Sequence, residues 1–248
     1  MSVTTPPLMK TCTAKFLTVA SVAGAGLVFS AASAFACGSG GYSYAGLSAT
    51  SPAFGIAATV TPLGGFDILN GHVAGWVGVG GPGQGPNGAD EWLQVGSSGF
   101  PELTGNDLYY ELTLPGKQTT YHQLASDLPL GKPSRVAVLE MGGRASWWRV
   151  WLNGSPVSNP IYMPASHGRW APMATAESWD GGTAGSCNGF LYRFRGVSIA
   201  QAPGGSWQPF RGAPFSSSTT RVRRSSPNGS FLAAQGDDAF RTLASINP

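Results

Sequence analysis

The chain has 248 residues, which is enough for one large β domain or two small ones. Charged residues make up 11% of it, and removal of Lys10 and Lys15 with the N-terminal segment described below lowers the formal net charge from +3 to +1. Charge therefore gives no argument for a nucleic acid or an acidic polymer as partner. With 36 glycines, 19 prolines and almost no helical periodicity, the composition favours an all-β protein with many turns.

The N-terminus predicts a secretory signal peptide over residues 1–36. A positively charged start precedes the apolar stretch 16–32, and Ala34-Phe35-Ala36 then fits a small-x-small cleavage site. That stretch is short for a membrane span, and no later segment approaches the ~20 apolar residues that a spanning helix needs. We expect a secreted protein without stable membrane insertion, whose mature chain begins at Cys37. A lipid anchor on Cys37 is the alternative.

The mature chain would keep two cysteines, Cys37 and Cys187, because Cys12 lies within the signal. In an oxidising compartment two cysteines most simply form a disulfide, and we expect this pair to do so. The three histidines are scattered along the sequence: His72, His122 and His167. Since these residues show no ligand spacing, neither a metal site nor another cofactor is expected.

Short apolar or alternating segments bounded by glycine and proline predict strands throughout residues 37–212. Residues 37–51 are expected to be extended. The expected strands are 55–62, 72–79, 91–96, 107–113, 120–126, 134–141, 146–152, 170–179 and 188–200. Such strands favour two packed antiparallel sheets, a β-sandwich of the jelly-roll type. The Ser- and Arg-rich residues 213–248 predict a C-terminal tail that is partly flexible.

The strand at 91–96 has one unusual face. Because side chains alternate along a strand, Leu93 and Val95 share an apolar face, whereas Trp92, Gln94 and Gly96 share the other. That second face carries an indole and an amide and no aliphatic side chain. A strand face of this kind is either solvated or lines a site.

Two later strands repeat this pattern of one polar and aromatic face. Its members are Asp107, Tyr109, Glu111 and Thr113 in one strand, and Thr175, Glu177 and Trp179 in the other. We therefore expect one sheet to present a concave face lined by tryptophan, tyrosine, glutamine and acidic side chains.

Four segments follow one another in the order found in a known family: WVGVGG at 76–81, LQVG at 93–96, DLYYEL at 107–112 and TAESW at 175–179. Through them the region 71–200 resembles the eqolisins, which are glutamic peptidases with a concanavalin A-like double sheet and a Gln/Glu catalytic dyad. The family's Leu-Gln-x-Gly pattern matches Gln94, and its Ala-Glu-Trp pattern matches Glu177. The chain departs from the family in the loop after the first segment, where members carry an acidic residue and this chain has Gly80 and Gly81.

The resemblance implies a secreted, acid-acting endopeptidase with a concanavalin A-like fold that works on a protein or peptide substrate as a monomer. Glu177 would activate a water molecule, because a carboxyl can accept and return a proton. Gln94 would stabilise the oxyanion of the tetrahedral intermediate. The substrate would be bound by the side chains that surround the dyad: Trp76, Trp92, Asp107, Tyr109, Glu111, Thr175 and Trp179.

Other interpretations remain open. The same face could bind a glycan or peptide without catalysis, as in a lectin-like sandwich. Glu111 and Glu177 could act as the two acids of a glycoside hydrolase. In a purely structural interpretation, Gln94 bonds a neighbouring strand and Glu177 pairs with Arg149 or Arg193.

Overall fold

The structure, a computed structural model, describes residues 41–64, 67–180, 187–226 and 229–245. The predicted signal peptide lies outside these residues. So does Cys37, and with it one partner of the predicted disulfide to Cys187. The described residues belong to one compact unit, Ala34–Pro248.

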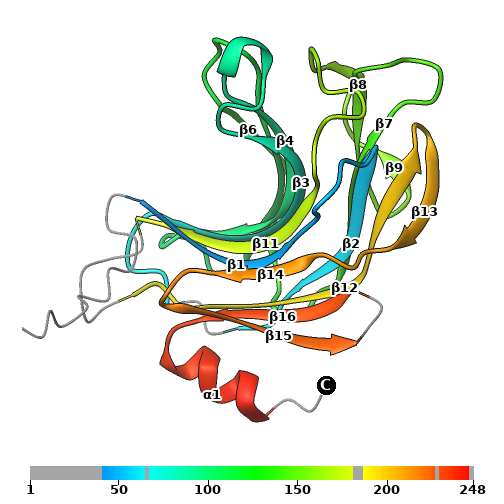
Figure 1. Ribbon diagram of the computed structural model, residues 1–248. Helices are drawn as coiled ribbons and strands as arrows, with labels where there is room; N and C mark the ends of the chain where they lie inside the picture. Colours follow the sequence, from blue (N-terminus) through cyan, green and yellow to red (C-terminus); the bar gives the residue numbers. More distant parts are fainter. Residues whose placement is uncertain (1–40, 65–66, 181–186, 227–228, 246–248) are drawn as a thin grey trace, which may run out of the picture. The chain divides into compact units, whose positions relative to one another are not determined.

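The first sheet consists of seven antiparallel strands. In order across the sheet they are β14 (Ala213–Ser216), β1 (Tyr42–Ser48), β11 (Met173–Trp179), β3 (His72–Gly81), β4 (Glu91–Gly99), β5 (Asn106–Thr113) and β6 (Thr120–Leu128). Figure 1 shows β3 and β4 curving strongly, with the concave side turned away from β12, β15 and β16 of the second sheet. We call this side the concave face.

The second sheet is also antiparallel. In order across the sheet its strands are β10 (Ile161–Tyr162), β8 (Trp147–Leu152), β7 (Ser134–Glu140), β2 (Gly55–Pro62), β12 (Phe190–Ala202), β16 (Ser230–Gln235) and β15 (Thr220–Ser226). In addition, β13 (Gly205–Pro209) pairs with β12, and β9 (Ser155–Pro156) pairs with β8. A 3-10 turn, η1 (Pro86–Gly88), lies in the loop between β3 and β4, and the helix α1 (Asp237–Ser245) follows β16.

The hydrophobic core lies between the sheets. It takes one face of most strands, including Val77, Leu93 and Val95 from the first sheet and Phe190 and Phe194 from the second, all nearly or fully buried. Burying the side chain of a single large aliphatic or aromatic residue contributes about 1.5–3 kcal/mol to the free energy of unfolding. The core therefore fixes which face of the first sheet is left for a site. The predicted all-β, two-sheet sandwich is confirmed.

One close approach between the sheets requires a glycine. A Cβ atom on Gly75 of β3 would lie 2.5 Å from Cδ1 of Tyr192 on β12. The Tyr192 ring, which is fully buried, thus packs directly on the β3 backbone. Because Gly75 carries no side chain, β3 can lie close to the second sheet while its neighbours Ala74 and Trp76 occupy the concave face.

Two segments differ from the sequence-based expectation. Residues 42–48, expected only to be extended, form β1 and pair along their whole length with β11. Residues 213–248 were expected to form a partly flexible tail. They contain β14, which extends the first sheet, β15 and β16, which extend the second, and the helix α1. The arginine-rich sequence of β15 suggested a flexible tail. In the structure, however, Val222 between the arginines packs against the core, and Arg223 Nη1 donates a hydrogen bond to the Leu243 carbonyl oxygen at 2.7 Å.

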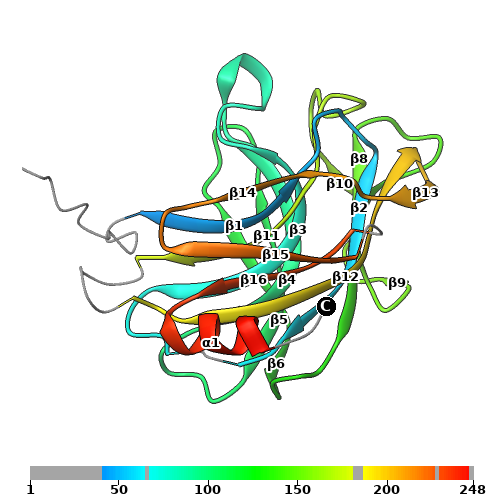
Figure 2. The same ribbon diagram turned by 60° about the horizontal axis from the view of Figure 1, so that its bottom comes forward.

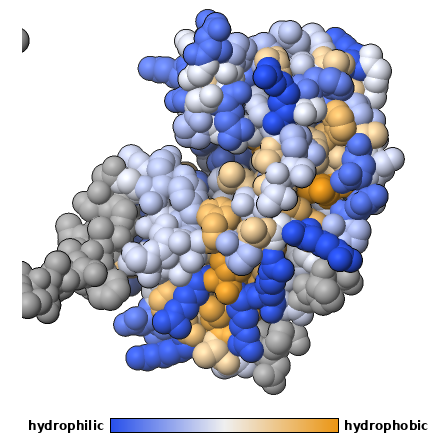
Figure 3. Space-filling view, viewed as in Figure 1, coloured by the Kyte–Doolittle hydropathy of each residue, from blue (hydrophilic) through white to orange (hydrophobic). Residues whose placement is uncertain are grey.

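The helix α1 covers part of the outer face of the second sheet, where it lies over β16 and β12 (Figure 2). Leu243 and Ala239 of the helix pack on Leu191, Leu232 and Ala234 in a second, smaller buried cluster. In the lower part of Figure 3, where β15 and α1 lie, hydrophilic side chains flank a strip of hydrophobic surface.

Candidate functional site

Gln94 lies on β4 near the middle of the concave face. The register places it directly opposite Glu111 of β5 on one side and Gly78 of β3 on the other. Its side chain is 7% exposed, and its Nε2 donates a hydrogen bond to the Tyr109 hydroxyl oxygen at 3.2 Å. Since an amide nitrogen carries two hydrogens, one donor position remains for a further acceptor.

Glu177 lies on β11, between Tyr44 of β1 and Ala74 of β3 in the register. It is 4% exposed, and its Oε1 is 3.6 Å from His72 Nε2. Arg149 and Arg193, the partners considered in the structural interpretation, belong to β8 and β12 of the second sheet. The contact made by Glu177 in the structure is therefore to a histidine on its own sheet.

The structure places Gln94 and Glu177 on the same face, two strands apart. Each is a diagonal neighbour of Trp76 on the intervening β3, because Trp76 stands opposite Gly96 and Thr175. Diagonal neighbours in an antiparallel sheet are about 7–8 Å apart, so roughly 15 Å of sheet surface separates the two Cα atoms. A group shared by both side chains would lie over Trp76, on the inside of the curve.

Glu111 is the carboxyl closest in register to the Gln94 amide. Its Oε1 accepts a hydrogen bond from Trp92 Nε1 at 2.8 Å. Burial raises the pKa of Glu111, the bond from Trp92 partly offsets this, and the charge of Glu177 raises the pKa further. The influence of Glu177 on this pKa shows that the two carboxyls share one electrostatic environment.

Asp107 forms a second buried acidic position on β5. It is 4% exposed, and its Oδ2 accepts hydrogen bonds from Gln123 Nε2 at 2.7 Å and from the Tyr121 hydroxyl at 3.4 Å. Its Oδ1 has no hydrogen-bond partner among the described residues. Tyr121 is also within hydrogen-bond distance of Ser98 Oγ, at 2.9 Å. Asp107 thus anchors a small polar network beside the acidic pair.

Trp76, Thr175 and Tyr109, predicted to contact substrate, are nearly or fully buried in the structure. Trp76 and Tyr109 pack together with Ala74 in a small cluster. The Thr175 hydroxyl donates a hydrogen bond to the Ala176 carbonyl oxygen at 3.0 Å. These residues form the floor of the concave face, whereas Trp179, 40% exposed, stands at its rim.

The sequence analysis missed an arc of rings around Glu177. Ring contacts connect Tyr44 with Tyr42, Tyr42 with His72, His72 with Phe100, Phe100 with Tyr121 and Tyr121 with Tyr109. The rings come from four strands, β1, β3, β5 and β6, and from Phe100 directly after β4, so its members are far apart in sequence. Strand alternation within residues 42–48 was the one available signal, since it places both tyrosines of β1 on one face.

The concave face is acidic. The seven strands of the first sheet contain no lysine or arginine. Burial and the charges of Glu177 and Glu111 raise the pKa of Tyr42 to about 12 and that of Tyr44 further still. Such a face opposes further negative charge and favours protonated carboxyls, which is the setting that general acid catalysis requires.

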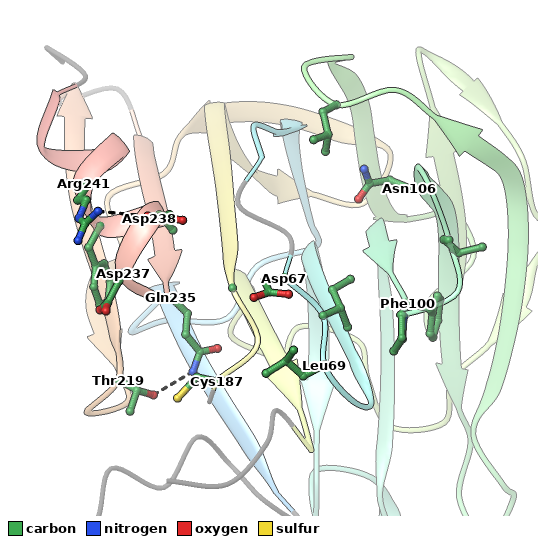
Figure 4. Close-up of a pocket in the computed structure, with 18 of the residues that line it drawn as sticks. Asp67, Leu69, Phe100, Asn106, Cys187, Thr219, Gln235, Asp237, Asp238 and Arg241 are labelled. Atoms are coloured by element: carbon green, nitrogen blue, oxygen red, sulfur yellow. Dashed lines mark hydrogen bonds and ion pairs between the residues drawn. The ribbon is translucent and has the colours of Figure 1, made fainter. Parts of the chain in front are cut away.

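A cavity of about 1380 Å³ lies elsewhere, among the loops that hold Leu69, Phe100 and Cys187 and the start of α1 (Figure 4). Its lining includes none of the dyad or substrate-binding residues predicted from the sequence, although Phe100, which contacts His72, borders it. Among the described residues there is no group of three or more histidine, cysteine or acidic side chains placed to hold a metal ion. Within the same residues, no helix has the length and apolarity to cross a membrane.

Comparison with known proteins gives a relationship at the level of the fold. No family model and no curated protein matches the sequence. Among solved structures, scytalido-glutamic peptidase bound to a peptide-based transition-state analogue aligns over 79% of this chain and 98% of its own, with 14% identity and a TM-score of 0.51. SCP-B, an eqolisin in complex with the tripeptide Ala-Ile-His, covers the same shares with 16% identity and a TM-score of 0.45.

A tetrameric galectin from the ball sponge Cinachyrella also aligns, over 63% of this chain and 98% of its own, with 11% identity and a TM-score of 0.38. The likeness to scytalido-glutamic peptidase confirms the predicted concanavalin A-like sandwich. At 14% identity it carries the architecture alone. The function must be argued from the concave face itself.

Proposed function

We propose that the protein is a secreted acid endopeptidase that hydrolyses peptide bonds with Gln94 and Glu177. The observation that carries this proposal is their placement on one buried, acidic face of a curved sheet, on either side of Trp76. A water-activating carboxyl and an oxyanion-binding amide are the minimum that amide hydrolysis needs in the absence of a nucleophilic side chain.

In the proposed reaction an extended peptide lies across β3 with its scissile carbonyl above Trp76. Glu177 accepts a proton from water as the water oxygen bonds to the carbonyl carbon. The second hydrogen of the Gln94 amide bonds to the oxyanion that develops. The proton then passes to the leaving nitrogen as the carbon–nitrogen bond breaks, so the water is divided between the two products and Glu177 is regenerated.

The neighbouring side chains support these roles. Tyr109 holds the Gln94 amide through the hydrogen bond at 3.2 Å, and this limits the rotation of the donor. Burial raises the pKa of Glu111, which favours its neutral form beside Gln94 and so disfavours a second negative charge close to the oxyanion. The raised pKa of Glu111 favours activity at acidic pH.

The test is cleavage of a denatured protein by the mature chain at about pH 3–5, where ordinary carboxyl groups titrate. We expect Glu177→Gln and Gln94→Ala each to lower kcat/KM at least 100-fold, the usual cost of losing a general base or an oxyanion donor. Two exposed residues provide matched controls, Glu102→Gln and Gln118→Ala, which we expect to retain activity. Absence of cleavage by the wild-type chain, or full activity of Glu177→Gln, would refute the proposal.

A second candidate function is glycan binding without catalysis. It is favoured by the exposed rings at the rim, since Tyr42, Tyr121 and Trp179 are 40–51% exposed and sugars stack on such surfaces. Glycan binding that persists in the Gln94→Ala, Glu177→Gln double variant, together with the absence of cleavage by the wild-type chain, would select this function instead.

A further inference from the structure

His72 is the residue that contacts Glu177, and its position follows from the register. It is the first residue of β3 and stands opposite Trp179, two residues before Ala74, which stands opposite Glu177. Side chains two apart on a strand share a face, so His72 and Glu177 are diagonal neighbours on the concave face. The imidazole Nε2 and the carboxylate Oε1 are 3.6 Å apart.

Three aromatic rings hold the His72 imidazole in place. It stacks on the Trp179 indole, with ring centroids 5.7 Å apart and an angle of 25° between the planes. Phe100 approaches to 5.8 Å and Tyr42 to 6.4 Å. These contacts fix the plane of the imidazole beside Glu177.

His72 is also the basic side chain of this face. Apart from His122, which stacks on Tyr110, it is the one basic side chain in the seven strands of the first sheet. The separation from Glu177 exceeds the 2.7–3.2 Å of a normal hydrogen bond but lies within the range of an ion pair. The contact therefore acts mainly through charge when the imidazole is protonated.

The groups that face this pair are otherwise acidic or phenolic. Tyr42 and Tyr44 approach from β1, Tyr109 and Glu111 from β5, and Tyr192 lies on β12 of the second sheet. The charge of Glu177 raises the pKa of each of these five groups. His72 is the basic side chain that lies against Glu177, with its Nε2 3.6 Å from Glu177 Oε1.

We propose that His72 is a positioning residue of the proposed active site, which orients the Glu177 carboxylate and, when protonated, keeps it in the charged form that accepts a proton from water. This inference rests on the proposed peptidase function for its catalytic consequence. The contact between the two side chains does not depend on that function, so the two can be tested separately.

The kinetic test compares His72→Gln with His72→Lys through the pH dependence of kcat/KM. We expect His72→Gln to move the acid limb toward higher pH and to lower kcat about 10-fold at pH 4 with little change in KM, because an opposite charge nearby favours the charged form of a carboxyl. His72→Lys restores a positive charge and should return the acid limb toward that of the wild type. His122→Gln removes a histidine outside the concave face and should leave the profile unchanged. A His72→Gln profile that coincides with the wild-type one would overturn the proposal.

A second measurement needs no activity. Urea midpoints of His72→Gln, Glu177→Gln and their double variant form a double-mutant cycle at pH 5. We expect the midpoint shift of the double variant to be smaller than the sum of the single shifts, whereas His122→Gln combined with Glu177→Gln should be additive. Additive shifts for His72 and Glu177 would show that the side chains do not interact. If the wild-type chain cleaves nothing and the cycle is still non-additive, the proposed function fails while the His72–Glu177 contact stands.

Discussion

Gln94 and Glu111 stand directly opposite each other on β4 and β5, which places an amide and a buried carboxyl side by side on the concave face. Trp92, two residues before Gln94 on the same strand, donates its indole N–H to Glu111 Oε1. Three residues that the sequence assigned to one face therefore form one connected unit, in which Trp92 orients Glu111 and partly offsets the effect of burial on its pKa.

Replacing Trp92 with phenylalanine should raise the pKa of Glu111 further. The indole hydrogen bond favours the charged form and lowers this pKa, whereas burial and the charge of Glu177 raise it, so loss of the donor leaves only the raising effects beside the smaller influence of His72. The shift can be measured from the side-chain carbonyl carbon of Glu111 by NMR titration of the wild type and Trp92→Phe. An unchanged or lower Glu111 midpoint in Trp92→Phe would contradict this account.

Tyr109→Phe should reduce catalysis more than it reduces stability. The variant removes the hydroxyl that accepts the Gln94 hydrogen bond but keeps the buried ring, so the expected loss of unfolding free energy is about 1 kcal/mol. An amide that is free to rotate is a poorer oxyanion donor, and we expect kcat to fall roughly 10-fold. Steady-state kinetics at pH 4 and urea unfolding check the two effects. Equal proportional losses for an exposed control, Tyr162→Phe, would indicate that the hydroxyl has no specific role.

Much of the concave face could be predicted because strand alternation is a local property. The positions of Trp92, Gln94, Asp107, Glu111 and Glu177 on one face follow from a period of two residues along each strand. His72 could not be assigned in this way. Its importance comes from the pairing of β3 with β11, and the sequence alone does not specify which strands are neighbours.

The same distinction explains why the strands of residues 213–248 were not predicted. Apart from the two-residue strands β9 and β10, the strands between residues 55 and 200 were recognised from their residue patterns and from nearby glycine or proline. β15 has an arginine-rich sequence and is stabilised by its pairing with β16, together with the contacts of Val222 with the core and of Arg223 with α1. The contacts of Val222 and Arg223 are made with residues distant in sequence, so local composition suggested a flexible tail.

Gly96→Ala should destabilise the first sheet strongly. A Cβ atom at this position would lie 2.1 Å from the Gly75 carbonyl oxygen and 2.7 Å from the Trp76 Cα atom, so backbone atoms would have to move. Overpacking of this kind costs about 1–3 kcal/mol or more. Gly41→Ala is a suitable control, because nothing lies within 4 Å of its added Cβ. Chemical denaturation of both variants measures the difference, and equal stabilities would show that β3 and β4 can separate at little cost.

Glu91 is a buried carboxyl on the opposite face of β4 from Gln94. It is the first residue of the strand, is 0% exposed, and neither of its carboxyl oxygens has a hydrogen-bond partner among the described residues. It lies under the loop between β3 and β4, where a Cβ on Gly85 would be 3.1 Å from Glu91 Oε2. Burial raises the pKa of Glu91 to about 7. The carboxyl is therefore neutral in the folded protein at acidic pH.

This residue should make the protein more stable in acid than at neutral pH. Because the folded pKa of about 7 exceeds the ordinary value of 4.5, the folded state binds more protons than the unfolded state between these values. Glu91 thus contributes about 3 kcal/mol to the free energy of unfolding below about pH 4.5, and this contribution is lost as pH rises through 7. Glu91→Gln cannot ionise, so its unfolding free energy should decline less between pH 5 and pH 8 than that of the wild type, while the exposed control Glu102→Gln should follow the wild type. Urea unfolding at each pH measures the slopes, and parallel slopes for wild type and Glu91→Gln would show that Glu91 does not cause the pH dependence.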